Sequence, residues 1–181
     1  MPINSKSKGS AYERVTARQL SQWLYGNTTS LYRSRASGAL FTKSSFVSEV
    51  GDISPIKTSV YFPFCIECKN RETGCGIDSL LIKGDKSELY KWFSRNEADA
   101  ATANLFPLLI FKQNYAPTMV LFRQLGKFAT ESGPSKFSLS AFRFSEEDVI
   151  YLAKLSDLIE GVKGGVLLNY LKVKGYKAHG E

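Results

Sequence analysis

The chain has 181 residues, and its 24 Lys and Arg against 17 Asp and Glu give a formal net charge of +7. This length suits one domain, and a hydrophobic content of 43% is enough for a buried core, which excludes a disordered chain. No apolar run approaches the roughly 18 residues of a membrane span and no signal peptide opens the chain, so we expect no membrane contact and a cytoplasmic location. The excess of positive charge favours a polyanionic partner.

The first predicted element is a helix from Ser10 to about Leu24. Ser10 is a candidate N-cap, and Glu13 three residues later completes the pattern of a capping box. Residues 1–9 are polar and basic, and we expect them to be loose. Gly26 and Asn27 end the helix.

Strands dominate the next part of the chain. Residues 33–45 are expected to begin as a short strand and to continue as a loop. Two further strands are predicted at Val50–Ile53 and Val60–Lys69. The first seven residues of the second one are nearly all apolar, which is typical of a strand buried on both faces.

The second half of the chain mixes helices and strands. The pattern predicts, in order, a short helix (80–83), a longer helix (about 85–104), strands at 107–111 and 118–122, and a last helix that Ser145 caps and that ends near Gly161. Acidic residues 146–148 stand in the first turn of that helix, where the helix dipole favours them. Its apolar stripe fits either the core or a dimer surface, of which the core is the more frequent outcome.

This order of elements predicts an α/β fold with a mixed central β-sheet flanked by helices. We expect a single domain over residues 1–181. Its core spans about residues 8–123, and a helical and basic extension follows over about residues 124–181. Residues 127–142 show no clear pattern.

Charged side chains at the ends of the two central strands are the strongest functional signal. Asp52 follows Gly51 on the first strand, and Glu67 and Lys69 close the second. Alternate side chains of a strand share a face, so Glu67 and Lys69 project together. Two carboxylates with open positions suit a hard divalent cation, and an ammonium group can steady an attacking water. The alternative is a solvated face, but the apolar neighbours favour an active site.

Three cysteines allow a second interpretation. Cys65 and Cys68 have the spacing of a zinc knuckle, with Cys75 further on, but the only histidine is His179 in the tail. Zinc needs about four ligands of suitable geometry. We therefore interpret the cysteines as reduced side chains that fill a strand and the loop after it.

Four short segments, in this order and spacing, resemble the PD-(D/E)xK nucleases and, more narrowly, phage-encoded and archaeal Holliday junction resolvases. They are Lys8-Gly9-Ser10-Ala11-Tyr12-Glu13-Arg14, Ser37-Gly38-Ala39, Gly51-Asp52-Ile53 and Ile66-Glu67-Cys68-Lys69. Residues 89–93 and 107–112 look like the helix and strand that follow the site in phage members. The resemblance covers about residues 6–123 and implies a restriction endonuclease-like core.

The resemblance also implies roles for individual residues. Glu13 is expected beside the metal, directly or through water, unless it serves as a helix cap. Ser37 matches a flexible loop serine important for junction cleavage, although a plain loop serine would look the same. Phosphate contacts are implied for four cations: Lys8, Arg14, Arg33 and Arg35. The family often has a Gln in the helix after the Glu-x-Lys motif, where this chain offers Arg95 or Asn96.

These residues predict metal-assisted hydrolysis of phosphodiesters. Asp52, Glu67 and the backbone carbonyl of Cys68 are the expected ligands of Mg²⁺, with Mn²⁺ as a substitute, and Lys69 is expected to orient water or stabilise charge. No phosphate-cradling nucleotide motif is present, so ATP use is not expected.

Three functions fit such a site. A homodimeric resolvase would cut branched DNA, in the host cytoplasm if phage-encoded, because two symmetric sites suit paired cuts. A sequence-specific endonuclease of the homing or restriction type would need an element that reads base edges, for which residues 124–181 provide room. A non-catalytic DNA-binding module fits least well, since the Asp, Glu and Lys are all present.

Overall fold

The computed structural model describes residues 5–34, 50–123, 138–146 and 148–179. In chain order the elements are α1 (Ser5–Tyr25), β1 (Leu31–Arg33), β2 (Ile53–Pro55), β3 (Phe64–Arg71), α2 (Ile77–Lys83), the 3₁₀ turn η1 (Gly84–Lys86), α3 (Glu88–Ala103), β4 (Phe106–Gln113), β5 (Met119–Phe122), β6 (Leu139–Arg143), β7 (Val149–Lys154), α5 (Leu155–Gly161) and α6 (Gly164–Val173).

A five-stranded mixed sheet forms the centre of the molecule, with strand order β3-β4-β5-β7-β6. β3 and β4 are parallel, and the other neighbours are antiparallel. β1 and β2 form a separate antiparallel pair beside β3, which is an edge strand of the large sheet. The α/β fold class predicted from the sequence is therefore confirmed.

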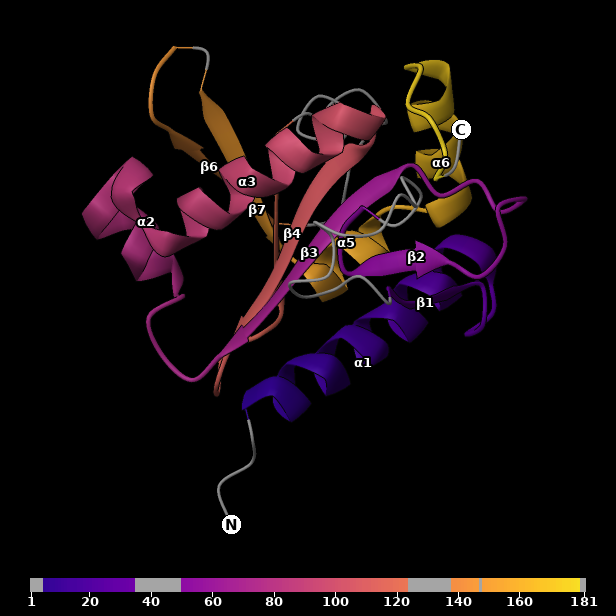
Figure 1. Ribbon diagram of the computed structural model, residues 1–181. Coiled ribbons are helices and arrows are strands. Elements are labelled where there is room, and N and C mark those ends of the chain that lie inside the picture. Colours follow the sequence, from indigo (N-terminus) through magenta and orange to yellow (C-terminus); the bar gives the residue numbers. More distant parts are fainter. Residues whose placement is uncertain (1–4, 35–49, 124–137, 147, 180–181) are drawn as a thin grey trace.

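Helices cover both faces of this sheet (Figure 1). On one face, α1, α5 and α6 pack against alternate residues of the strands, among them Phe64, Ile66 and Cys68 of β3. On the other face, Leu89 and Phe93 of α3 pack against β4, β5 and β7. Since β3 lies between α1 and α3, its side chains point alternately toward the two layers.

The first helix begins earlier than the sequence predicts. It starts at Ser5, so Ser10 lies inside the helix and is not its N-cap, and the capping-box interpretation of Glu13 is wrong. The buried side of the helix includes Leu20 and Leu24, whereas Val15 is 60% exposed. The local capping signal at Ser10 does not set the start of this helix. Packing against the sheet stabilises a longer helix of 21 residues.

The predicted last helix is also wrong over its first half. Residues 149–154 form β7, which pairs with β5 and β6, and only Leu155–Gly161 is helical. Ser145 Oγ does accept the Asp148 N–H at 3.1 Å, as an N-cap would, but a strand follows. Pairing of both edges of β7 inside the sheet outweighs the local helix signal.

Residues 155–179 are part of the same packed structure. Trp23 Nε1 of α1 donates to the Val162 carbonyl at 2.7 Å, and α6 approaches α1 so closely that a Cβ at Gly164 would lie 2.3 Å from the Trp23 carbonyl oxygen. Buried His179 bonds the Phe64 carbonyl of β3 through Nε2 at 2.7 Å. The stripe at Leu155 and Leu158 is core, as the more frequent outcome suggested.

All three cysteines are buried and none forms a disulfide, in agreement with their interpretation as packing residues. Burial raises the pKa of the Cys65 and Cys68 thiols. No described helix has the length and apolar character needed to cross a membrane.

Candidate active site

Asp52 is held by backbone contacts at the outer edge of β3, directly before β2. Its N–H donates to the Ile66 carbonyl at 2.7 Å, its carbonyl accepts the Ser34 N–H at 2.9 Å, and its Oδ2 accepts the Cys68 N–H at 2.8 Å. Three hydrogen bonds fix both the backbone and the carboxylate, so this side chain is preorganised beside the strand that carries Glu67.

Gly51 makes this approach of the two chains possible. Its φ is +88°, and a Cβ there would lie 2.8 Å and 2.9 Å from the carbonyl oxygen and amide nitrogen of Ile66. A side chain at this position would push residue 52 away from β3. The glycine before Asp52 is therefore required by geometry.

Glu67 and Lys69 extend from β3 toward the α3 layer and form an ion pair. Trp92 of α3 lies beside them, with its ring centroid 5.8 Å from Lys69 Nζ and 5.6 Å from the Arg71 guanidinium carbon. A cation over an indole face is attracted by the ring quadrupole. Trp92 thus limits the range of positions that the Lys69 ammonium can take.

Glu13 reaches the same edge from α1. Its carboxylate accepts a hydrogen bond from Arg33 Nε of β1, and both side chains are largely shielded from solvent. Glu13 therefore takes part in a tertiary ion pair and not in a helix cap. Glu13, Glu67 and Lys69 all act electrostatically on Asp52, so these four predicted site residues form one electrostatic cluster, although its three carboxylates do not lie close enough together to hold one metal ion.

Burial raises the pKa of the Asp52 carboxyl from 3.8 to about 7, and repulsion by Glu67 adds to this. The Cys68 N–H opposes the shift by stabilising the charged form. A carboxyl group whose ionisation is disfavoured beside a second carboxylate is typical of a functional site, and a cation bound between the two would relieve the repulsion.

The oxygen ligands at hand fit a hard divalent cation. Among the described residues no group of three or more His, Cys, Asp or Glu side chains lies close enough to hold a metal. The Cys68 N–H faces Asp52 at the outer edge of β3, and its carbonyl points to the same edge because both groups of a strand residue point to one side. Two carboxylates and this carbonyl are the oxygen donors that Mg²⁺ and Mn²⁺ accept.

Residues 4–155 match the model of a family described as "Phage putative PDDEXK endonuclease". The chain belongs to this family. Neither the curated proteins nor the solved structures give a significant match. Membership supports a nuclease that acts on DNA, and nucleases of this superfamily generally use divalent metals.

Asn96 is one of the two residues on α3 at the turn where the resemblance leads us to expect a Gln. It is buried, and its Nδ2 donates to the carbonyls of Cys65 and Leu108 at 3.2 Å and 3.0 Å, while the Cys65 thiol lies 3.0 Å from its Oδ1. Its side chain thus ties α3 to β3 and β4. Arg95, the other candidate at this turn, is exposed.

The predicted DNA contacts fall in different surroundings. Lys8 is partly buried, bonds Asn114 Oδ1 at 2.9 Å and pairs with Glu72 at 3.6 Å, so it links α1 to two turns at one end of β3 and β4. Arg14 is exposed on α1, and Arg33 lies on β1. Ser37 and Arg35 lie outside the described residues, so their roles stay predictions.

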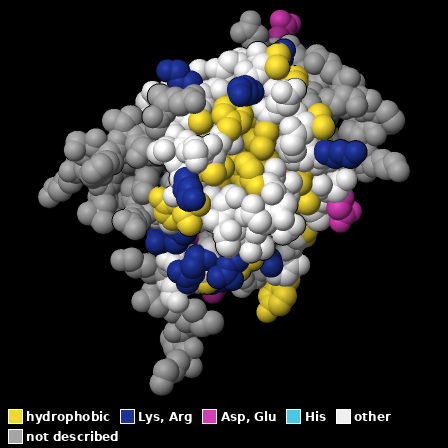
Figure 2. All heavy atoms as spheres, turned by 90° about the vertical axis from the view of Figure 1, so that its right-hand side faces the viewer, with side chains coloured by type: hydrophobic (Ala, Val, Ile, Leu, Met, Phe, Trp, Pro, Cys, Tyr) yellow, Lys and Arg dark blue, Asp and Glu magenta, His cyan; other side chains and the backbone are white. Residues whose placement is uncertain are grey.

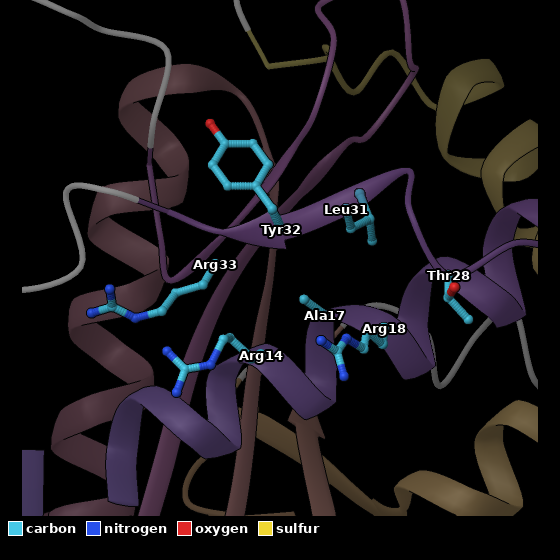
Figure 3. Close-up of a pocket in the computed structure, with 7 residues that line it drawn as sticks. All are labelled: Arg14, Ala17, Arg18, Thr28, Leu31, Tyr32 and Arg33. Carbon is cyan, nitrogen blue, oxygen red and sulfur yellow. The ribbon is translucent and has the colours of Figure 1, made fainter. Parts of the chain in front are cut away.

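Sequence reasoning missed a pocket beside this cluster. It has a volume of about 380 Å³, and Arg14, Arg18 and Arg33 are among the side chains that line it (Figure 3). Arg18 and Thr28 carry no motif, because a single Arg on a helix or a Thr in a turn is ordinary surface chemistry. Only the fold brings them together.

Proposed function

We propose that this protein is a divalent-metal-dependent DNA endonuclease whose catalytic centre consists of Asp52, Glu67, Lys69 and Glu13. The observation that carries the proposal is the buried Asp52 carboxylate, bonded to the Cys68 N–H and placed next to Glu67. Such a pair of oxygen ligands at a strand edge, next to a lysine, suits hydrolysis of phosphodiesters.

Each residue has a distinct task in this proposal. Asp52, Glu67 and the Cys68 carbonyl would hold the ion, Mg²⁺ or Mn²⁺, and Glu13, which does not lie close enough to complete a group of three carboxylates, would act on it through water. A divalent ion held by these residues would supply Lewis-acid chemistry, that is, polarisation of the scissile phosphate and activation of a water. Lys69 exchanges its partner Glu67 for the attacking water or the charged phosphate, while Trp92 keeps the ammonium nearby.

The proposed substrate is a four-way DNA junction, cut by a homodimer with two symmetric sites in the host cytoplasm. Support comes from the resemblance of the core motifs to resolvases and from the described part of the C-terminal third. β6, β7, α5 and α6 complete the sheet and cover one of its faces, and so are used for the core fold. The second candidate, a sequence-specific endonuclease, would need an element that reads bases.

Cations on the surface support a DNA partner. Lys172 and Lys174 of the α6 region lie over Tyr61 and Tyr170, at 5.8 Å and 5.4 Å from the ring centroids. Figure 2 shows the face over α6 and the β1–β2 pair, where Lys and Arg side chains surround hydrophobic ones and acidic side chains are few. Such a face attracts a polyanion.

A cleavage panel tests the proposal. Four-way junction, flap and linear duplex are incubated with Mg²⁺, with Mn²⁺ and with EDTA. We expect paired symmetric nicks in the junction with either ion and none in EDTA. Asp52→Asn, Glu67→Gln and Lys69→Ala each lose nearly all cleavage, whereas the exposed-site control Glu160→Gln keeps it. Cleavage by Glu67→Gln at the wild-type rate refutes the site, and a recurring cut motif in linear DNA without junction preference favours the sequence-specific enzyme.

A further inference from the structure

The pocket between α1 and β1 has an apolar floor and a cationic rim. Ala17 and Leu31 form the floor and are 1% and 4% exposed. Arg14 and Arg18 rise from α1, and Arg33 comes from β1 on the opposite side (Figure 3). A concave surface lined by three guanidinium groups focuses a positive potential on whatever enters it.

The side chains that line this pocket include no carboxylate. Arg14 and Arg18 are exposed and form no ion pair with any residue in the described ranges. They stand four residues apart on one helix, an arrangement of like charges that costs helix stability. An anion between the arginines would remove this cost.

The end of the pocket opposite Arg33 is a rigid turn. Asn27 Oδ1 accepts the N–H groups of Thr29 and Ser30 at 3.0 Å and 2.9 Å, which closes an Asx turn around Thr28. The same oxygen lies 3.4 Å from Ser21 Oγ of α1. Thr28 therefore presents its hydroxyl group on a preorganised rim, seen at the far side from Arg33 in Figure 3.

The pocket is continuous with the catalytic cluster through one side chain. Arg33 lines the pocket and donates through Nε to Glu13, and Glu13 acts electrostatically on Asp52. In Figure 3 the Arg14 and Arg33 side chains extend to the same side. A chain of phosphates that lies along the pocket would therefore pass next to the residues that bind the metal.

We propose that this pocket binds backbone phosphates of the DNA strand that continues past the scissile phosphate, a role that rests on the proposed function. Guanidinium groups bind phosphate oxygens with two parallel hydrogen bonds. Arg14 and Arg18 are about 6 Å apart along the helix axis, close to the roughly 7 Å rise of two nucleotides along one strand. This spacing suits two phosphates that lie two nucleotides apart on one strand, which a polymer offers and a free nucleotide with a single phosphate does not.

The test measures DNA binding in EDTA, where no cleavage takes place. Affinity of the full chain for the four-way junction and for linear duplex is followed by fluorescence anisotropy from low to high salt. Arg14→Gln and Arg18→Gln are compared with Arg143→Gln, which removes the same charge from an exposed site on β6, at the opposite edge of the sheet from β3. Circular dichroism checks that each variant folds.

We expect each pocket variant to bind about tenfold more weakly at low salt and to lower the slope of log affinity against log salt by about one. Arg143→Gln is expected to match the wild type. We also expect an effect in duplexes that carry one neutral methylphosphonate in place of a phosphate. At one or two positions this replacement should weaken binding by the wild type. It should leave binding by Arg18→Gln unchanged, because the arginine that would contact that phosphate is already absent. Wild-type slopes in both pocket variants overturn the proposal.

Two further outcomes separate this proposal from its alternatives. If a mononucleotide binds the wild type and not Arg18→Gln, while the DNA slopes stay unchanged, the pocket is a nucleotide site and the DNA assignment is wrong. If the wild type cleaves DNA with metal, and the Arg14 and Arg18 variants bind DNA as tightly as the wild type does, the proposed role of the pocket is refuted and the proposed catalysis is not. A chain that shows the expected slopes but never cleaves supports the pocket and refutes the proposed catalysis.

Discussion

Replacing Asp52 by Asn should stabilise the protein against unfolding while removing its activity. The folded state holds the Asp52 proton more tightly than the unfolded state, since burial and Glu67 raise its pKa from 3.8 to about 7. Ionisation therefore costs folding free energy. This cost is absent below the unfolded pKa, grows between about pH 4 and 7, and is complete above pH 7.

The magnitude follows from the two pKa values. A difference of about 3 in pKa corresponds to on the order of 4 kcal/mol at alkaline pH, as an upper limit, because the repulsion is shared with Glu67. Asn keeps an oxygen that can accept the Cys68 N–H and carries no charge. At pH 8 without metal, Asp52→Asn should therefore be more stable than the wild type by roughly 2–4 kcal/mol, and near pH 4 the two should be alike.

Urea unfolding in EDTA, followed by tryptophan fluorescence at several pH values, measures this difference. The exposed Asp85, replaced by Asn, is the matched control and should behave as the wild type. Adding Mg²⁺ at pH 8 should stabilise the wild type and leave Asp52→Asn unchanged. A difference between the two proteins that stays constant from pH 4 to 8 would refute the reasoning, because it would place no raised pKa at residue 52.

Substitutions at three other residues examine the parts that position the site. Gly51→Ala should lower the free energy of unfolding by at least 1–2 kcal/mol, roughly the cost of a left-handed backbone for a residue with a Cβ, and should nearly abolish cleavage; urea unfolding and a nicking assay measure both. Trp92→Leu should slow single-turnover cleavage several-fold by releasing Lys69, and Trp92→Phe should slow it less; equal rates would refute a positioning role. Asn96→Ala should lower the free energy of unfolding by about 1–3 kcal/mol, because the Cys65 and Leu108 carbonyls lose the hydrogen bonds that Asn96 Nδ2 donates; an unchanged urea midpoint would contradict this.

The central motif could be predicted because its signals are local. Glu67 and Lys69 end a run of apolar residues, and such a run predicts a buried strand whatever the rest of the chain does. The strand begins at Phe64 and not at Val60, yet the two side chains still share the face toward α3. Asp52 was found from its glycine and from the short apolar segment around it, although the strand predicted at Val50–Ile53 is wrong in its bounds: β2 is Ile53–Pro55, and Asp52 lies just before it.

Errors arose where a local signal had a competing tertiary partner. Ser145 followed by three acidic residues looks like a helix start, but β5 and β6 need β7 between them. Ser10 and Glu13 look like a capping box, but Arg33, twenty residues later, takes the carboxylate. Arg18 could not be singled out at all, since its significance depends on Arg33 and on the turn at Thr28.

Helix α1 separates two opposite electrostatic needs of the proposed reaction. A metal site requires carboxylates, which repel DNA. Binding of the DNA strand requires cations, which would compete with the metal for those carboxylates. Glu13 pairs with Arg33 and acts electrostatically on Asp52, whereas Arg14 and Arg18 line the pocket with β1. Arg33 contacts both sides through its bond to Glu13. Neighbouring positions on one helix can therefore hold phosphates and present an acid to the proposed metal site, because residues one apart on a helix do not face each other.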